Sequence, residues 1–379
     1  MSRIFLSAPD MSGRERAMVE EVFDSNYIAP VGTMLTRFEQ NICAYTGIAH
    51  GVALSSGTAG LHLALRIAGV KAGDEVWTSS FTFIGGVAPI VYLNAKPVFF
   101  DLSPASWTLD CDLLEAALDE AAAANALPAA IMPTDIYGQS CDLDRILSLA
   151  KRHDIPVIVD SAEALGSFYK SGVHAGKGAL MAVLSFNGNK MITTSGGGML
   201  LSDDPALIEK ARHLSTQARE PVDHYEHVEV GYNYRMSNVC AAIGVGQLEQ
   251  IEQKVAKRRA IFERYVEAFA DIEAVRSMPE PEGQRSTRWL TCITIDANNS
   301  VSAKNVQDAC AAQEIEVRPL WKSMHMQPVF SEMRFVGSGI CEHLFSHGLC
   351  LPSGSGMTDA EQERVIETIR GTLLNTSVG

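Results

Sequence analysis

The sequence predicts an α/β protein with a large domain, built on a mixed and mostly parallel sheet flanked by helices, and a smaller C-terminal α/β domain. Between Gly51 and Ser202, short β-rich runs alternate with helical patterns, which is typical of a parallel sheet with helices on both faces. After Ser237 the pattern changes to a long helical stretch without proline, followed by two further strand patterns. The 379 residues are enough for two domains, and 46% hydrophobic with 20% charged residues is typical of a globular protein.

The elements of the large domain follow one another closely. Residues 55–70 (SSGTAGLHLALRIAGV) predict a turn and an amphipathic helix, 74–80 a strand that ends in polar residues, 83–95 a helix and 96–103 a strand. Residues 129–138, 144–154 and 155–166 repeat the strand–helix–strand order. Ligands of such sheets bind outside the carboxyl ends of the strands, where we therefore look for functional residues.

The C-terminal region begins with a predicted long helix over residues 237–272, with a weak point at Gly244 and Gly246. We place the domain boundary inside this helix, which gives a large domain of residues 1–246, N-terminal segment included, and a small domain of residues 247–379. Residues 288–296 and 314–321 read as strands of the small domain, and residues 359–374 as a final helix with Asp359 near its start.

The overall charge excludes some partners. A net charge of −14 argues against nucleic acid and against an anionic membrane, both of which require a basic surface. No apolar run reaches the ~20 residues of a membrane helix, and the N-terminus lacks the apolar core of a secretory signal. Eight irregularly spaced cysteines without a C-x-x-C pair indicate reduced thiols in a cytoplasmic protein, and we expect no metal site.

Asp160 stands at the end of the apolar strand pattern IPVIVD. The ordinary interpretation is a helix N-cap, because the following SAEAL suits a helix. The alternative is a counter-ion for a protonated ligand nitrogen, since a carboxylate at a strand end is costly to bury without a partner. Asp160 alone does not decide between the two.

Residues 55–59 (SSGTA) begin a predicted helix, where unpaired N–H groups and the helix dipole favour a phosphate. Many helices begin with Ser or Thr as simple caps, so this signal is weak by itself. The chain has no Walker loop, because GVHAGKG has the wrong spacing and no Ser or Thr after its lysine. It also lacks a G-x-G-x-x-G between a strand and a helix, which argues against a dinucleotide-dependent dehydrogenase.

Lys190 lies in SFNGNKMITTSGGGML, between small and apolar residues. A lysine at a strand end usually places its amine in water. Here Gly196, Gly197 and Gly198 would leave space for a flat ligand, and a desolvated lysine can act as a nucleophile toward a carbonyl. Taken with the phosphate site at 55–59 and with Asp160, Lys190 predicts pyridoxal 5′-phosphate. In this interpretation Lys190 bonds the aldehyde carbon and Asp160 pairs with the ring nitrogen.

Four motifs carry a resemblance to a known family: SSGTAGLHLAL, VDSAEALGSFYK, SFNGNKMITTSGGGML and GYNYRMSN. The chain resembles, nearly end to end, the nucleotide-sugar aminotransferases of the DegT/DnrJ/EryC1/StrS type, which have the fold-type I architecture of aspartate aminotransferase. FLSAPDMSGRE, SNYIAPVG, RPLWKSMH and LPSGSGM are most similar to the enzymes that aminate a UDP-4-keto-6-deoxy-N-acetylhexosamine on the bacillosamine route.

The resemblance implies a role for each matching residue. Lys190 and Asp160 are the expected catalytic residues, and Lys190 would move a proton between the cofactor and the sugar carbon. The other expected cofactor contacts are Gly57, Thr58, Ala59 and Ser185 at the phosphate, Phe83 stacked on the ring, Glu163 near the ring or its hydroxyl, and Asn233, which would reach the phosphate bound by the other subunit of a homodimer with shared active sites. The expected substrate contacts are Asn26, Tyr27, Ile28, Tyr232, Arg235, Arg318, Lys322 and His325.

The implied reaction moves the amino group of L-glutamate to C4 of the UDP-linked 4-keto sugar, in two half-reactions. A GDP-4-keto-6-deoxymannose 4-aminotransferase is the alternative within the family. A sugar 3-dehydratase is disfavoured because those enzymes have His in place of Lys190, and a non-catalytic partner on the same fold is disfavoured because it would lose Lys190 or Asp160. Two positions depart from the family pattern. Asp135 stands where the H-L-Y-G string has His, and Ser161 follows the ring aspartate where Ala is common.

Overall fold

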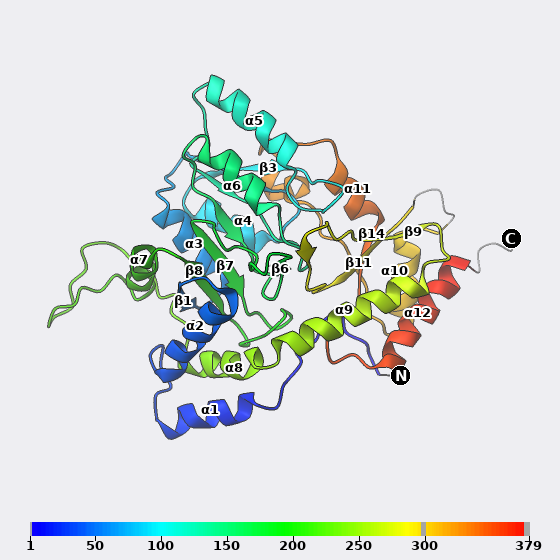
Figure 1. The fold of residues 1–379 in the computed structure, drawn as a ribbon, viewed down its shortest axis with the longest axis horizontal. Helices are drawn as coiled ribbons and strands as arrows, with labels where there is room; N and C mark the ends of the chain where they lie inside the picture. The colour runs from blue at the N-terminus through cyan, green and yellow to red at the C-terminus, as the bar shows by residue number, and fades with distance from the viewer. Residues whose placement is uncertain (1, 297–300, 375–379) are drawn as a thin grey trace.

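The computed structural model describes residues 2–296 and 301–374. A large α/β part carries the N-terminal helices, and a smaller part carries most of the C-terminal third (Figure 1). The helix α9 (Ile251–Ala268) runs from one part to the other. Nothing in this arrangement decides the predicted boundary near residue 247, which stays a prediction. Within the described residues, no helix is long and apolar enough to cross a membrane.

The sheet of the large part is mixed and mostly parallel, as predicted. Its strands are β1 (His50–Leu54), β2 (Glu75–Ser79), β3 (Lys96–Phe100), β4 (Ala130–Met132), β5 (Ile158–Asp160), β7 (Met181–Ser185), β8 (Gly198–Ser202) and β13 (Phe335–Val336). Two four-stranded groups, β1-β8-β7-β5 and β13-β3-β2-β4, are joined by parallel bridges from β4 and the residues after it to Val157 and Asp160. Only β8 runs antiparallel to its neighbours among these pairings. The carboxyl ends of the other strands therefore meet at one edge.

Helices cover both faces of this sheet. They are α2 (Thr33–Thr46), α3 (Gly57–Ile67), α4 (Ile84–Tyr92), α5 (Cys111–Ala123), α6 (Leu143–Lys151), α7 (Pro205–Ser215) and α8 (Asn238–Leu248). The first helix, α1 (Glu15–Asp24), packs on α8 (Figure 1). Apolar residues of α3 and α4 pack with Val76, Ile158 and Val183 in one core cluster, whereas α5 and α6 pack with Trp77, Phe100 and Val159 in another. Alternate residues of the same strands thus face different helix layers, as the two-residue repeat of a strand requires.

The smaller part is built on an antiparallel sheet in the order β12 (Arg318–Pro319), β14 (Gly348–Leu351), β11 (Thr291–Ile295) and β9 (Val275–Ser277). Its other elements are α9, α10 (Ala303–Ala312), α11 (Ile340–His347), α12 (Asp359–Leu374), and two short 3₁₀ helices, η1 (Met324–Met326) and η2 (Pro328–Phe330). A two-stranded ribbon, β6 (Phe168–Tyr169) with β10 (Gln284–Arg285), connects the two parts. The N-terminal segment also joins the smaller part, because Ile4 bridges Ile315 and Ser353 N–H donates to the Leu6 carbonyl.

The prediction of one long helix over residues 237–272 was wrong. The chain forms two helices, α8 and α9, separated at Glu249 and Gln250. Gly244 and Gly246 are not the weak point, because both lie inside α8. A Cβ at Gly244 would lie 2.6 Å from the Phe38 ring, and one at Gly246 would lie 2.9 Å from the backbone of Glu15. These glycines allow α2 and the start of α1 to pack closely on α8. The strand predicted at 314–321 is also shorter than expected, with two residues in β12.

Candidate active site

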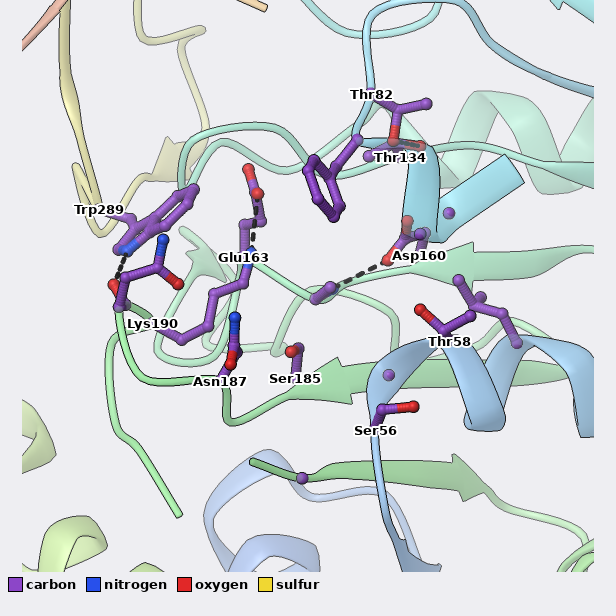
Figure 2. A pocket seen from close by; sticks show the side chains of 18 of the residues that line it. Ser56, Thr58, Thr82, Thr134, Asp160, Glu163, Ser185, Asn187, Lys190 and Trp289 are labelled. Carbon is purple, nitrogen blue, oxygen red and sulfur yellow. Dashed lines mark hydrogen bonds and ion pairs between the residues drawn. The ribbon is translucent and has the colours of Figure 1, made fainter. Parts of the chain in front are cut away.

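A pocket of about 450 Å³ lies at the carboxyl edge of the large sheet, in the size range of small-molecule sites. It is lined from four directions: the turn that begins α3, the loops after β2 and β4, the ends of β5 and β7, and the smaller part of the molecule. The lining residues include Ser56, Gly57, Thr58, Thr82, Phe83, Thr134, Asp160, Glu163, Ser185, Asn187, Lys190, Gly196, Trp289 and Trp321 (Figure 2). This is the edge at which open α/β sheets bind their ligands.

The first turn of α3 forms one end of the pocket. Ser56 caps the helix, with its Oγ accepting a hydrogen bond from Ala59 N at 3.0 Å. The amides of Gly57 and Thr58 belong to the first turn, where backbone N–H groups have no acceptor within the helix. Figure 2 shows Ser56 and Thr58 here, with Ser185 on the adjacent strand end. Amides, hydroxyl groups and the positive end of the dipole together suit a phosphate.

Gly198 explains why this turn can lie so close to the sheet. A Cβ at Gly198 would lie 2.4 Å from the Gly57 nitrogen. The expected reason for the glycines, space beside a ligand ring, therefore fails for Gly198, which instead allows β8 to pack against the start of α3. Gly196 does line the pocket, and a Cβ there would meet open space.

Asp160 lies at the end of β5, 4% exposed, on the same side of the pocket as Thr82 and Thr134. It is not a helix N-cap, because the residues that follow form turns and its Oδ1 accepts a hydrogen bond from Ala162 N at 3.2 Å. Burial raises the pKa of Asp160 to about 7, and the nearby charge of Glu163 adds to the effect. A carboxylate held in this way favours a cationic partner in the pocket.

Backbone sterics keep the region around the Asp160 carboxylate open. A Cβ at Gly86, in the first turn of α4, would lie 2.5 Å from Asp160 Oδ2 and 3.1 Å from Thr82 Oγ1. Any larger residue at this position would displace the carboxylate. Gly86 thus contributes to the site, although the sequence analysis gave this glycine no role beyond a helix.

Lys190 and Glu163 form an ion pair at the opposite side of the pocket. Lys190 Nζ donates to Glu163 Oε1 at 2.9 Å, with side-chain exposures of 13% and 3%. Glu163 Oε2 accepts a second hydrogen bond from Tyr137 N at 2.8 Å. Burial raises the pKa of Glu163, and the contact with Lys190 opposes that rise. The Lys190 amine is therefore largely shielded from water, as the sequence interpretation required. It points toward Glu163 (Figure 2).

The predicted cofactor residues fall into two groups. The structure brings Gly57, Thr58, Phe83, Asp160, Glu163, Ser185 and Lys190 to the pocket wall, while Ala59 is buried one position behind it. Asn233 is exposed and does not line the pocket. Its segment instead pairs with β1, through hydrogen bonds such as Ser55 N to the Tyr234 carbonyl at 2.7 Å.

None of the predicted substrate contacts lines this pocket in the described chain. Asn26, Tyr27 and Ile28 are exposed after α1. The others have partners of their own: Tyr232 accepts from Arg66 at 2.6 Å, Arg235 donates to Glu39 at 2.6 Å, and Arg318 pairs with Glu316 at 2.8 Å. Lys322 is half-buried beside η1. These substrate roles stay predictions.

His325 belongs to a separate cluster. Its ring bonds Ser80 Oγ at 2.7 Å and Glu342 Oε1 at 3.0 Å, and stacks on Phe335. Potential ligand atoms of His325, Cys341 and Glu342 lie within 4.8 Å of one another, a group that the sequence did not predict. The bonds to Ser80 and Glu342 account for both ring nitrogens of His325, whereas Glu342 Oε2 is buried without a hydrogen-bond partner among the described residues.

The two departures from the family pattern contact each other. Ser161 Oγ donates to Asp135 Oδ2 at 2.6 Å, and Cys141 N donates to Asp135 Oδ1 at 2.8 Å. Asp135 is fully buried, which raises its pKa to about 6. Asp135 N also donates to the Asp160 carbonyl at 2.9 Å, so Asp135 holds the chain at Asp160 and at Ser161, the next residue.

Several pocket residues were missed. Thr82 and Thr134 bond each other at 3.3 Å beside Asp160, and the strand-end position of both was a usable signal. Asn187 lies in the quoted stretch SFNGNKMITTSGGGML, three positions before Lys190. Trp289 and Trp321 come from the smaller part, and no local pattern indicates that they reach the pocket.

The chain is similar to known proteins over nearly its whole length. Residues 9–370 match the model of the DegT/DnrJ/EryC1/StrS aminotransferase family. EpsN of Bacillus subtilis (strain 168), provisionally named a pyridoxal phosphate-dependent aminotransferase, is 48% identical over 97% of this chain and 95% of its own. GDP-perosamine synthase of Caulobacter vibrioides is 36% identical over 99% of both chains. The PLP form of Spr1654 from Streptococcus pneumoniae, provisionally named a sugar aminotransferase, superposes with a TM-score of 0.87 at 25% identity, covering 99% of both chains.

The pocket fits the cofactor of these proteins. It offers a helix start for a phosphate, a buried carboxylate for a ring nitrogen, and a sequestered amine for an aldehyde. The match to the family model covers nearly the whole chain, and the architecture is the expected fold type I. This protein belongs to the DegT/DnrJ/EryC1/StrS aminotransferase family and is an enzyme that uses pyridoxal phosphate.

Proposed function

We propose that the protein transfers the amino group of L-glutamate to C4 of a UDP-4-keto-6-deoxy-N-acetylhexosamine, giving the UDP-4-amino-4,6-dideoxy sugar and 2-oxoglutarate. The observation that carries the proposal is the grouping of Asp160, Glu163 and Lys190 around one pocket with the α3 phosphate site. All three side chains are largely buried, and Asp160 forms no ion pair within the described residues, which is expensive unless a ligand supplies the positive charge.

Each residue has a defined task in this proposal. Bound pyridoxal phosphate supplies an aldehyde that takes up the amino group and a protonated ring that withdraws electrons. Asp160 keeps the ring nitrogen protonated, and the first turn of α3 with Ser185 holds the phosphate. Lys190 holds and moves the proton at the reacting carbon, and Glu163 accepts a hydrogen bond from the lysine amine.

The choice of a UDP sugar depends on sequence segments outside the pocket. FLSAPDMSGRE, SNYIAPVG, RPLWKSMH and LPSGSGM support it through their resemblance to enzymes of the bacillosamine route. The alternative is GDP-4-keto-6-deoxymannose, which the similarity to GDP-perosamine synthase favours. Neither sugar is distinguished by the residues that line the pocket, and a cytoplasmic enzyme is consistent with both.

We also propose a homodimer in which Asn233 completes the site of a second copy. Its side chain is exposed, and its own pocket does not include it. The chain just before it forms a long loop that projects from the body beside α7 (Figure 1). Mixing an Asn233→Ala chain with a Lys190→Ala chain tests this arrangement. A shared site leaves one intact pocket in each mixed dimer and restores activity, whereas independent sites give only the activity of the Asn233→Ala chain.

The substrate is tested by incubating the purified protein with glutamate and a panel of 4-keto sugar nucleotides. Formation of the 4-amino product from UDP-linked N-acetylhexosamines, together with 2-oxoglutarate, supports the proposal. A product formed from GDP-4-keto-6-deoxymannose alone would replace it with the alternative. Lys190→Ala is the control, because it removes the proposed proton carrier while leaving the sugar-binding surface intact.

A further inference from the structure

Trp289 comes from the smaller part and lies against Lys190 in the pocket. It is 2% exposed and precedes β11. Lys190 Nζ lies 4.2 Å from the centroid of its ring. At this distance an ammonium group is attracted by the electron-rich face of an indole. Lys190 is thus held by a carboxylate and an aromatic face together (Figure 2).

The indole N–H makes a second contact with the same turn. Trp289 Nε1 donates to the carbonyl of Asn189 at 2.7 Å, immediately before Lys190 (Figure 2). That carbonyl also accepts from Ser7 Oγ at 2.9 Å. Arg258 connects the two donors, because its guanidinium bonds both Ser7 Oγ and the Trp289 carbonyl. The backbone of the lysine turn is therefore anchored from outside the large sheet.

Tyr137 links the two partners of the amine. Its backbone N–H holds Glu163, and its ring stacks on Trp289 with an interplanar angle of 26°. Tyr137 has a φ of 52°, in the left-handed region that a tyrosine rarely adopts. Such conformations persist where surrounding contacts determine them. Glu163 and Trp289 are thus fixed relative to each other, with the amine of Lys190 between them.

We propose that Trp289 is a positioning residue for Lys190. Its ring and Glu163 hold the amine near the pocket whenever it is not bonded to the cofactor, and its N–H fixes the turn from which the lysine extends. A transaminase needs such a resting position, because the lysine is released in every cycle while the cofactor carries the amino group. The inference rests on the proposed role of Lys190.

The expected effect follows from the freedom of a lysine side chain. A lysine side chain that nothing holds spreads over many rotamers. The fraction in the one reactive geometry then falls about 10-fold or more. Trp289→Leu removes the ring and the N–H, and should slow covalent capture of the cofactor by about 10-fold. Trp289→Phe keeps an aromatic face but loses the N–H, and should slow capture by about 3-fold.

The experiment strips the full-length protein of cofactor and mixes it with pyridoxal phosphate in a stopped-flow instrument. Capture forms the bond between Lys190 nitrogen and the aldehyde carbon and releases the aldehyde oxygen as water, with a change in visible absorption. Binding of pyridoxamine phosphate, which cannot bond the lysine, is measured in parallel. Trp77→Phe is the matched control, because Trp77 is equally buried and its Nε1 bonds Glu75 at 3.0 Å, far from the pocket.

Both Trp289 variants are expected to capture pyridoxal phosphate more slowly than the parent. Their affinity for pyridoxamine phosphate and the capture rate of Trp77→Phe should stay within about 2-fold of the parent values. Capture at the parent rate, or an equal loss of pyridoxamine phosphate affinity, would overturn the inference. If Trp289→Leu does not fold, Trp289→Phe decides.

Lys190→Ala separates the positioning role of Trp289 from the proposed role of Lys190. Capture that persists in Lys190→Ala refutes the role of Lys190 itself, whereas capture lost there but normal in the Trp289 variants refutes the positioning role alone.

Discussion

Replacing Asp160 by Asn should make the cofactor-free protein more stable at neutral pH. The pKa of Asp160 rises from 3.8 to about 7 on folding because the carboxyl group is buried. The folded protein therefore holds this proton more tightly than the unfolded chain does. Raising the pH ionises the unfolded chain first, so stability falls as the pH approaches the folded-state pKa.

The size of the effect follows from the shift. One pH unit corresponds to 1.36 kcal/mol, so a rise of about 3 units corresponds to a destabilisation of about 4 kcal/mol above pH 7. Roughly 2 kcal/mol of this should appear between pH 5 and pH 7. Asn has nearly the shape of Asp and no charge, so the Asp160→Asn protein should lack this part of the pH dependence.

The assay is thermal unfolding of the cofactor-free parent and Asp160→Asn proteins from pH 5 to pH 8. The variant should gain about 2–5 °C over the parent as the pH rises, at about 1–2 °C per kcal/mol for a chain of this length. Groups common to both proteins cancel in the difference. With pyridoxal phosphate bound, the order should reverse, because the parent then has a cationic partner for its carboxylate. Parallel pH curves for the two cofactor-free proteins would refute the reasoning.

Three further changes test the surroundings of the site. Gly86→Ala places a methyl group 2.5 Å from Asp160 Oδ2 and should weaken cofactor binding at least about 10-fold in a spectroscopic titration, with normal binding as the contrary result. Gly198→Ala places one 2.4 Å from the Gly57 nitrogen and should lower the unfolding free energy by about 1–3 kcal/mol; unchanged denaturant midpoints would contradict the packing argument. Ionisation of Asp135 should lower the stability of the parent protein as the pH rises to about 6, the pKa of Asp135, and Asp135→Asn should lack this loss. A difference between the two proteins that is confined to higher pH would point to another group.

The sequence predicted the parts of the site that lie at strand and helix ends. The SSGTA turn, Asp160 and Lys190 could be found because each interrupts a regular pattern with a residue type suited to one ligand group. Parallel strands then bring their carboxyl ends to one edge of the sheet. The meeting of the turn at Ser55 with Asp160, 105 positions later, could therefore be expected without knowing any side-chain contact.

The contribution of the smaller part could not be predicted. Trp289 reaches Lys190 across 99 positions in the sequence, and nothing in RWLTCITID distinguishes a pocket residue from a core residue. The ion pair of Arg235 with Glu39 also depends on how a loop pairs with β1, which no local pattern encodes.

Glycines gave the least reliable signals, because a sequence does not show what approaches them. Gly244 and Gly246 suggested a weak helix, but they are required where α8 meets Phe38 and the start of α1. Gly86 attracted no interest in the sequence, yet its missing side chain leaves the space that the Asp160 carboxylate occupies.

The most direct test of the account is the position of the covalent bond to the cofactor. The purified protein is reduced with borohydride, digested and analysed by mass spectrometry. If Lys190 binds the cofactor, the protein should carry one phosphopyridoxyl group, on Lys190. This group should be absent when the bound cofactor is first converted to its amino form with glutamate. A modification on another lysine, or none in protein that shows the visible band of the bound cofactor, would contradict the assignment of Lys190.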